Sequence, residues 1–282
     1  MSGEAEKAER AYAYMVRCAG GQLYTGWTND PASRLHAHKS GKGAKCTRAL
    51  GAQRFAYLER CTDKSAALRR EAALKKLTKA QKEALCAEWA EKNLPRLSLA
   101  TRADAAEILD IYNWYVLRHT ATFQVTPSSL PEYEDWVEST RALIPLLLAR
   151  DGAGKLLGYA CAPRYQPRAA YDRAVESAIY SAHHAQGFGV GDTLYRALLD
   201  ILDGMGYWNV YALVADPNPA SERIHARLGF TCVGREPHTA YKFGWLGLST
   251  WWLPLRRGNE KPEPTHPLTQ EQVEEILGRY QA

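Results

Sequence analysis

The sequence contains no apolar stretch of the roughly twenty residues that a membrane-spanning helix requires. The apolar run at 143–149 is far shorter. The opening residues, MSGEAEKAER, are charged and lack the apolar segment of a secretory signal. These absences exclude an integral membrane protein, and we expect a cytoplasmic protein without a membrane partner.

Cysteine is present, but without a pattern. No C-x-x-C pair joins any of the six cysteines, so neither a zinc site nor a disulfide framework is predicted. We expect buried or incidental thiols, which suit a reducing cytoplasm.

Charge is distributed unevenly along the 282 residues, which suffice for about two domains. Residues 10–92 carry 17 Lys and Arg against seven Asp and Glu, whereas residues 93–282 are slightly acidic. A basic domain suits a polyanion such as nucleic acid; the alternative is a solvated basic surface without a partner. We predict a leader at 1–10, a basic domain at 11–92, a linker at 93–96, a second domain at 97–257 and a tail at 258–282.

Segments rich in Tyr and Val predict strands in the basic domain. We expect strands at 11–18, 23–28 and 54–59, and helices that begin at Pro31, Ser65 and Thr78. Residues 40–48 read as a basic, glycine-containing loop.

Several short motifs follow one another through this domain. They are Tyr12-Ala13-Tyr14, Tyr24-Thr25-Gly26, Thr28-Asn29-Asp30, Ser33-Arg34-Leu35 with His38, Gly41-Lys42-Gly43-Ala44-Lys45, Thr47-Arg48 and Ala67-Leu68-Arg69-Arg70-Glu71. In this order and spacing the domain resembles the small single-domain GIY-YIG nucleases. The resemblance implies a three-stranded α/β domain, nucleic acid as a partner, and a catalytic cluster of Tyr14, Tyr24, Arg34 and Glu71.

The residue types of that cluster suit phosphodiester hydrolysis. Glu71, the only carboxylate in its segment of a basic helix, is the candidate ligand for Mg²⁺, which takes one or two carboxylates plus water. Arg34 would neutralise charge growing on the phosphate, and a Tyr hydroxyl would position or deprotonate water. The alternatives are an ion pair of Glu71 with Lys75 and tyrosines that only pack in the sheet. We expect three cations to grip the nucleic-acid backbone: Lys42, Lys45 and Arg48.

The second domain mixes strands and helices, which predicts an α+β fold with a mostly antiparallel sheet flanked by helices. At its centre an apolar, β-branched run at 175–181 predicts one buried strand. Helical spacing of Leu194, Ala197 and Leu198 then predicts a helix from about Gly191. A strand, a glycine-rich turn and a helix in this order form a cradle of backbone N–H groups for a phosphate or pyrophosphate.

The turn itself reads Gln186-Gly187-Phe188-Gly189-Val190-Gly191. Asp192 follows the last glycine, which excludes both the Lys-Ser/Thr nucleotide loop and the dinucleotide fingerprint. The turn is similar to the Q/R-x-x-G-x-G/A signature of the GNAT N-acetyltransferases, which hold the pyrophosphate of coenzyme A. A glycine-rich turn without a ligand is the alternative.

Further separated motifs resemble the phosphinothricin-acetyltransferase-like group of that family. They are Ile111-Tyr112-Asn113, Thr120-Ala121-Thr122-Phe123, Gly158-Tyr159, Val175-Glu176, Asn218-Pro219-Ala220-Ser221, and His225 with Leu228-Gly229-Phe230. The resemblance implies acetyl-CoA as the cofactor and acetyl transfer to a small primary amine.

Acetyl transfer needs a base for the proton of the attacking amine, and Glu176 beside the cradle is the candidate. His225 stands where many GNAT enzymes place a tyrosine that protonates the leaving thiolate. The alternatives are a Glu in a salt bridge and a His packed in the core. We expect the coenzyme to contact Ile179, Tyr180, Ser181, Gln186, Gly187, Phe188, Gly189, Val190, Gly191, Asp192, Asn218 and Ser221.

The loop before Tyr171 predicts the class of amine. Arg164, Tyr165 and Arg168 suit a clamp for a carboxylate, and hence an amino-acid-like substrate. In the tail, a capping box at Thr269 and an apolar stripe predict a short helix. That helix docks either on a domain of this chain or on a second chain in a homodimer.

We therefore interpret the chain as a GIY-YIG nuclease-like domain fused to a GNAT N-acetyltransferase that acts on a small primary amine. The alternative is a nucleic-acid-binding or endonuclease protein whose second domain acetylates proteins or only senses acetyl-CoA.

Overall fold

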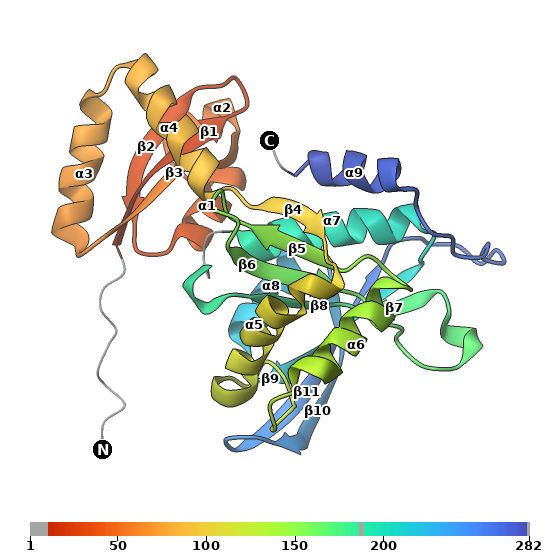
Figure 1. The fold of residues 1–282 in the computed structure, drawn as a ribbon. Helices are drawn as coiled ribbons and strands as arrows, with labels where there is room; N and C mark the ends of the chain where they lie inside the picture. The colour runs from red at the N-terminus through yellow and green to blue at the C-terminus, as the bar shows by residue number, and fades with distance from the viewer. Residues whose placement is uncertain (1–10, 186–188, 281–282) are drawn as a thin grey trace. The chain divides into compact units, whose positions relative to one another are not determined.

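The chain separates into two compact units, with the division between Leu94 and Pro95 (Figure 1). The structure, a computed structural model, describes residues 11–185 and 189–280. Each unit has its own sheets and its own buried side chains, and each is described by itself below.

The first unit is built on a three-stranded sheet with the order β2-β1-β3, in which both neighbours run antiparallel to β1. Its strands are β1 (Ala11–Cys18), β2 (Leu23–Thr28) and β3 (Ala52–Cys61). Its helices are α1 (Pro31–Lys39), α2 (Lys45–Leu50), α3 (Lys64–Lys76) and α4 (Lys79–Asn93). Asp30 begins α1 by accepting a hydrogen bond from the Ser33 N–H, with Pro31 in the first helical position, as the sequence predicts.

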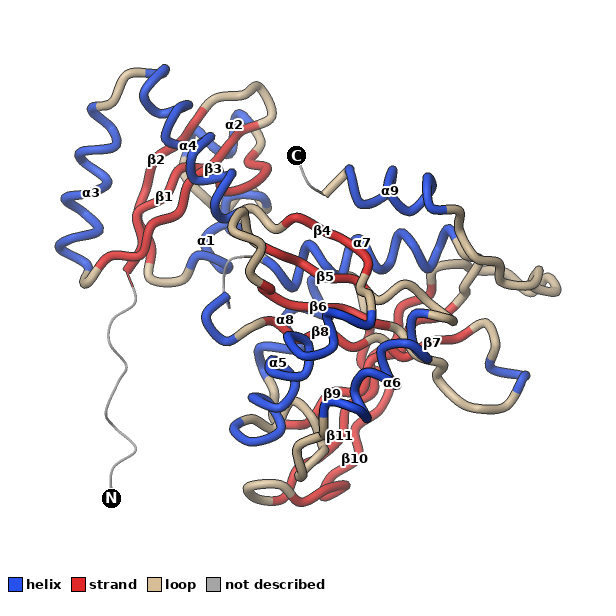
Figure 2. Tube along the Cα trace, in the orientation of Figure 1, coloured by secondary structure: helices blue, strands red, loops and turns tan. Residues whose placement is uncertain are grey.

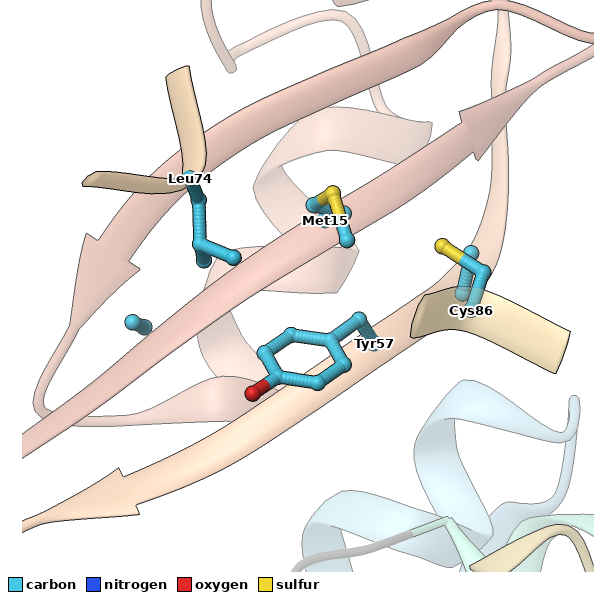
Figure 3. Packing of buried hydrophobic residues seen from close by; sticks show 6 residues of the cluster. Met15, Tyr57, Leu74 and Cys86 are labelled. Atoms are coloured by element: carbon cyan, nitrogen blue, oxygen red, sulfur yellow. The ribbon is translucent and has the colours of Figure 1, made fainter. Parts of the chain in front are cut away.

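Strand β1 carries a buried cluster on each face of this sheet, because successive side chains of a strand point to opposite sides. On one face Met15 packs with Tyr57 of β3, Leu74 of α3 and Cys86 of α4 (Figure 3). On the other face Tyr14 is completely buried. The central strand therefore holds the Tyr14 side chain in one position.

The helix predicted to begin at Ser65 has a different cap. The Asp63 side chain accepts a hydrogen bond from the Ala66 N–H at 2.7 Å, so α3 starts one residue earlier. Aspartate is as good an N-cap as serine, and it comes first along the chain.

The loop predicted at 40–48 is shorter than expected, because α2 begins at Lys45. Thr47 is buried in α2 and hydrogen-bonded to His38 of α1. This contact joins two segments that are separate in the sequence, so local composition gives no sign of it.

The second unit contains two four-stranded sheets, with the orders β4-β5-β6-β8 and β10-β11-β9-β7. Every pairing is antiparallel except that of β7 with β9, which confirms the predicted fold class. The first sheet has β4 (Arg96–Leu99), β5 (Leu147–Arg150), β6 (Leu156–Cys161) and β8 (Ala178–Ser181). The second has β7 (Ala174–Glu176), β9 (Asn209–Asp216), β10 (Thr231–Tyr241) and β11 (Trp245–Pro254).

Helices cover both faces of the first of these sheets. The helices of this unit are α5 (Ala105–Arg118), α6 (Leu130–Arg141), α7 (Val190–Gly204), α8 (Pro219–Arg227) and α9 (Gln270–Gly278). Of these, α8 contacts β9 of the second sheet and α9 contacts α7. Figure 2 shows α5 and α6 on one face of the sheet and α7 on the other. None of the helices in the described part of the chain is both long and apolar enough to cross a membrane.

The single strand predicted at 175–181 is in fact two strands. β7 pairs with β9, whereas β8 pairs with β6, and Ser177 joins them. Both halves are apolar, so the hydrophobic pattern cannot separate them; their pairing partners come from other parts of the chain. The two sheets diverge after Tyr211, the last residue of β9 that pairs with β7.

The tail helix α9 docks on α7 of its own unit (Figure 1). Thr269 and Gln272 form the predicted capping box. Val273 of this helix is buried. The Tyr280 hydroxyl donates to the Asp200 carboxylate of α7 at 2.7 Å. The sequence allowed this helix to pack either on a domain of this chain or on a second chain. In the structure it packs on its own chain.

Candidate functional site

In the first unit a buried tyrosine and a buried histidine share a hydrogen bond. Tyr14 Oη lies 2.8 Å from His38 Nε2, and Arg34 Nε donates to Tyr14 Oη at 2.9 Å. His38 Nδ1 lies 2.6 Å from Thr47 Oγ1, which donates its own proton to Ala44 O. Thr47 must then accept from His38 Nδ1, which leaves Nε2 to accept from Tyr14. The Tyr14 proton therefore points at a neutral imidazole, while a guanidinium contacts the phenol oxygen.

Burial sets the protonation of this pair. It raises the pKa of Tyr14 to about 12, an effect that the Arg34 hydrogen bond opposes. Burial, followed by the charge of Arg34, lowers the pKa of His38 to about 4. At neutral pH the phenol keeps its proton and the imidazole is uncharged, so both groups are neutral beside the Arg34 cation.

Tyr24 and Glu71 lie beside the same pair. The Tyr24 ring is 5.2 Å from the His38 ring and 6.4 Å from the Tyr14 ring. Glu71 of α3 is near enough for its charge to contribute to the raised pKa of Tyr14. Its Oε1 also lies 2.7 Å from Lys75 Nζ, so the ion pair considered as the alternative does form. The four residues that the sequence grouped as a cluster thus come together.

The cations expected to grip a nucleic-acid backbone all face solvent. Lys42 lies in the loop after α1, and Lys45 and Arg48 lie three positions apart on α2. Residues at that spacing share one helical face. They are thus available for phosphate contacts.

In the second unit Glu176 ends β7 at the point where the two sheets separate. Its side chain is half-buried, and burial raises its pKa. No salt bridge reaches this carboxylate within residues 11–185 and 189–280, so the salt-bridge alternative does not fit. A partly desolvated carboxylate without a cation is a stronger base than an exposed one.

A chain of hydrogen bonds runs from the neighbouring residue into the core. Ser177 Oγ lies 2.6 Å from Tyr195 Oη, and Tyr195 Oη lies 2.9 Å from His225 Nε2. His225 Nδ1 lies 2.8 Å from the Ser221 carbonyl oxygen. A carbonyl only accepts, so Nδ1 donates to it and Nε2 accepts from Tyr195.

His225 is only 7% exposed, and burial lowers its pKa. Its one ring proton is used at Ser221, so Nε2 has no proton to give to a thiolate. The geometry fits a histidine packed in the core, which orients Tyr195, better than it fits a proton donor.

The residues expected to hold the pantetheine arm lie on an edge strand. They are Ile179, Tyr180 and Ser181 of β8. This strand pairs with β6 along one side, and its other side pairs with no strand in the described part of the chain. Tyr115 Oη donates to the Ser181 carbonyl at 2.7 Å and holds the end of the strand.

Part of the glycine-rich cradle is described. Gly189 has φ +85°, a conformation that other residues rarely adopt, and it precedes the first turn of α7, which contains Val190 and Gly191. The Asp192 carboxylate pairs with Arg196 at 2.9 Å and with Arg227 at 3.0 Å. Three expected contact residues lie outside the described residues: Gln186, Gly187 and Phe188.

Asn218 and Ser221 meet at the start of α8. Asn218 Oδ1 accepts a hydrogen bond from the Ser221 N–H at 3.1 Å and caps the helix. The carbonyl oxygen of the Asn218 side chain is therefore engaged within the chain.

The three residues expected to form the substrate clamp do not come together at one place. The Tyr165 ring stacks on Tyr211 with 4.2 Å between centroids, and the charge of Glu176 adds to the burial that raises the Tyr165 pKa. Arg164 pairs with Asp172 at 3.3 Å instead. Arg168 is exposed. The side chains of Arg164 and Tyr165 therefore contact different groups, Asp172 and Tyr211.

Three residues of these networks were not foreseen as site residues: His38, Ser177 and Tyr195. His38 follows Arg34 by four positions, so the two share a helical face, and that signal was available. Ser177 and Tyr195 carried no signal, because the first sat inside an apolar run and the second within an amphipathic helix.

Comparison with known proteins follows this division. Residues 10–84 match the GIY-YIG catalytic domain, and residues 108–230 match the Acetyltransferase (GNAT) family. Over 170 residues the chain is 36% identical to phosphinothricin N-acetyltransferase of Streptomyces viridochromogenes, covering 60% of this chain and 90% of that protein. Over 79 residues it is 48% identical to UPF0213 protein YhbQ of Escherichia coli, covering 28% of this chain and 79% of that protein.

A solved structure gives the same result for the second unit. The phosphinothricin acetyltransferase of Sinorhizobium meliloti in complex with AcCoA aligns with a TM-score of 0.59 and 32% identity. The alignment covers 60% of this chain and 94% of that one. The chain therefore belongs to the GNAT acetyltransferase family through its second unit, and its first unit is a GIY-YIG catalytic domain.

Proposed function

We propose that this protein transfers the acetyl group of acetyl-CoA to the primary amine of a small amino-acid-like molecule. The observation that carries the proposal is Glu176, a half-buried carboxylate without a salt bridge in the described part of the chain, at the separation of two sheets. The related phosphinothricin acetyltransferases agree with it. They do not favour a domain that acetylates proteins or only senses acetyl-CoA.

Glu176 would act as the general base. An amine is protonated at neutral pH and attacks a carbonyl only after losing that proton. Because burial raises the pKa of Glu176, its carboxylate holds a proton more strongly than an exposed one, which favours transfer from the ammonium. Acetyl-CoA, when bound, supplies the activated thioester carbonyl.

Two aromatic rings beside Glu176 would receive the amine. Tyr165 and Tyr211 stack next to the carboxylate, and an aromatic face attracts a cation such as an ammonium group. Loss of the proton to Glu176 would then turn the bound cation into the nucleophile.

The coenzyme would lie along β8 and against the start of α7. Gly189 with its positive φ and the N–H groups of Val190, Gly191 and Asp192 suit a pyrophosphate. The open side of β8 suits an arm that hydrogen-bonds as an added strand does. We propose that Ser177, which is hydrogen-bonded to Tyr195 and through it to His225, fixes the backbone between β7 and β8 beside this arm.

Thiol release from acetyl-CoA, measured across amino acids, amino-acid analogues and polyamines, tests the assignment. Glu176→Gln keeps the size of the side chain and removes the base, so turnover should fall by about 10²–10⁴-fold. Glu138→Gln changes an exposed carboxylate on α6 and serves as the matched control. Equal turnover of the two variants would exclude Glu176 as the base.

A second activity is proposed for the first unit, on the strength of the Arg34–Tyr14–His38 hydrogen bonds. We propose that it hydrolyses phosphodiesters of nucleic acid. Tyr14, which is completely buried, would hold the Arg34 guanidinium toward the phosphate, and the partly exposed Tyr24 would position the attacking water. Glu71 would hold Mg²⁺ with water as the other ligands; the described residues contain no group of three or more metal-binding side chains.

Cleavage of labelled branched and single-stranded DNA and RNA with Mg²⁺ tests this second activity. Glu71→Gln should abolish cleavage and leave thiol release unchanged, because the two reactions use separate sites. Glu88→Gln, which breaks an exposed ion pair on α4, should change neither. Cleavage that persists in the Glu71 variant, or in excess chelator, would remove the metal from the proposal.

A further inference from the structure

The amino group of Lys242 is buried in the second unit, at the turn that joins β10 to β11. The residue is only 4% exposed, and burial lowers the pKa of its ammonium. In the part of the chain that the structure describes, no carboxylate forms an ion pair with this ammonium. A buried charge without a counter-charge is costly unless other polar groups satisfy its hydrogen bonds.

Two backbone carbonyls from a distant part of the chain accept hydrogen bonds from this ammonium. Lys242 Nζ donates to Thr122 O at 2.8 Å and to Tyr115 O at 3.3 Å. Tyr115 lies in the last turn of α5, where the backbone carbonyls carry the negative end of the helix dipole. Thr122 lies in the loop that follows this helix. The turn after β10 is therefore hydrogen-bonded to both the end of α5 and the loop behind it.

The segment that supplies these carbonyls also contacts the end of β8, along which the pantetheine arm of the coenzyme is proposed to lie. Tyr115 Oη donates to the Ser181 carbonyl at 2.7 Å, and the Tyr115 ring lies 5.3 Å from the Tyr180 ring. Thr122 Oγ1 lies 3.0 Å from Tyr112 Oη, and the Tyr112 ring also lies 5.3 Å from that of Tyr180. The last two residues of β8 are therefore held from the same segment as the two carbonyls.

A buried ammonium fixes the position of this segment more firmly than an apolar side chain does. A buried carbonyl that moves away from its donor loses a hydrogen bond that water does not replace. An arm that binds as an added strand needs the N–H and C=O groups of β8 at a fixed spacing. Small shifts of those groups cost affinity, so the placement of the segment matters for the coenzyme.

We propose that Lys242 is a positioning residue for acetyl-CoA: it holds Tyr115 and Thr122, and through them the end of β8 beside the pantetheine arm. This role rests on the proposed function, in which the arm lies along β8. It adds the β10–β11 hairpin to the elements that shape the coenzyme site.

Calorimetric titration of the full chain with two ligands tests this role. Acetyl-CoA contains the pantetheine arm, whereas the nucleotide half of coenzyme A, a phosphorylated ADP, lacks it. Lys242→Met keeps most of the length of the side chain and removes the ammonium. It should weaken acetyl-CoA binding by about tenfold, the effect of one hydrogen bond to a charged group, and leave binding of the nucleotide half unchanged. In thiol-release assays, KM for acetyl-CoA should rise by the same factor while kcat stays unchanged.

Further variants separate this role from a general loss of structure. Lys261→Met removes an exposed lysine of the same unit and should bind both ligands as the wild type does. Tyr115→Phe removes the hydrogen bond to Ser181 and should also weaken acetyl-CoA binding alone. Because Lys242 acts through Tyr115, the double variant should lose less affinity than the product of the two single losses. If Lys242→Met fails to fold, Lys242→Gln, which is shorter and uncharged, should give the same selective loss.

Unchanged acetyl-CoA binding in Lys242→Met would overturn the proposal, and so would an equal loss for both ligands, which indicates general damage to the unit. Single losses that multiply in the double variant would also overturn it, because Lys242 would then not act through Tyr115. The titration needs no amine. A wild-type chain that binds acetyl-CoA but acetylates no amine would therefore refute the acetyl-transfer proposal alone, and a wild-type chain that binds no acetyl-CoA would refute both.

Discussion

Each unit buries a tyrosine–histidine pair, and the two pairs differ in what touches the phenol. In both, the tyrosine hydroxyl donates to Nε2 of a neutral imidazole whose Nδ1 donates to an oxygen. In the first unit Arg34 contacts the oxygen of Tyr14. In the second, the neutral hydroxyl of Ser177 contacts Tyr195 instead.

That one neighbour decides what each pair can do. Burial raises the pKa of both tyrosines, so both phenols keep their protons at neutral pH. Tyr14, however, holds a cation that suits a phosphate, whereas Tyr195 has only neutral hydrogen-bond partners at its hydroxyl. The roles proposed for the two pairs therefore differ: Tyr14 positions a catalytic arginine, and Tyr195 supports the structure.

The largest effect should come from removing the two hydroxyls. Tyr14→Phe should reduce nucleic-acid cleavage by about 10²-fold, because it removes the hydrogen-bond partner that positions Arg34. Tyr195→Phe should reduce thiol release by less than about tenfold, because its hydroxyl contacts only neutral groups. Initial rates of both reactions on both variants give the comparison. A loss in Tyr195→Phe as large as that in Tyr14→Phe would contradict the difference between the two pairs.

A smaller effect is expected from a methyl group placed beside the Tyr14–His38 pair, compared with one placed in the first turn of α7. A Cβ at Gly26 would lie 2.5 Å from Tyr14 Oη, so Gly26→Ala should cost about 1–3 kcal/mol of stability. A Cβ at Gly191 would meet Ser181 Oγ at 3.5 Å, an ordinary contact, so Gly191→Ala should stay within about 0.5 kcal/mol. Urea midpoints measure both. An unchanged midpoint for Gly26→Ala would show that Tyr14 is not tightly held.

The two histidines also differ in the oxygen that accepts the hydrogen bond from Nδ1. For His38 it is the Thr47 side chain, so Thr47→Val leaves a buried N–H unpaired and should cost about 1–2 kcal/mol. For His225 it is the backbone of Ser221, so Ser221→Ala keeps the bond and should cost less than about 0.5 kcal/mol. Thermal unfolding of the two variants tests this difference, and equal losses would contradict it.

A further difference should appear in the pH dependence of stability. The folded chain lowers the pKa of His38 to about 4 from an ordinary value near 6.5, through burial and then Arg34. The unfolded chain therefore binds this proton first as the pH falls, and stability is lost between about pH 6.5 and 4. Urea midpoints over that range should fall less steeply for His38→Asn than for wild type. His36→Asn, an exposed position on α1, should keep the wild-type slope.

Local structure was predictable wherever short-range chemistry decides it. The hairpin strands β1 and β2 have the predicted bounds. Thr78 begins a helix, as expected, and it does so through a capping box with Gln81, because a side chain reaches a backbone N–H three residues ahead whatever the rest of the chain does. The family motifs likewise identified both units.

The break at Ser177 was not predictable. Residues on both sides of it are apolar and strand-forming, so periodicity gives one strand. The pairing of β7 with β9 and of β8 with β6 depends on strands far along the sequence. Yet this break leaves one edge of β8 without a paired strand and places Glu176 where the two sheets separate, so the feature most important to the proposed transfer site came from long-range pairing.

By itself, the sequence determined that this protein has two units, which families they belong to, and where most helices and strands begin, since propensity, capping and motif spacing are properties of neighbouring residues. The tertiary structure alone decided that Tyr165 lies by Glu176 while Arg164 pairs with Asp172, that Arg34 contacts the oxygen of Tyr14, and that α9 packs on α7. These outcomes depend on how segments that are distant in the sequence pack against one another and bury their surfaces. No local pattern of residues determines that packing.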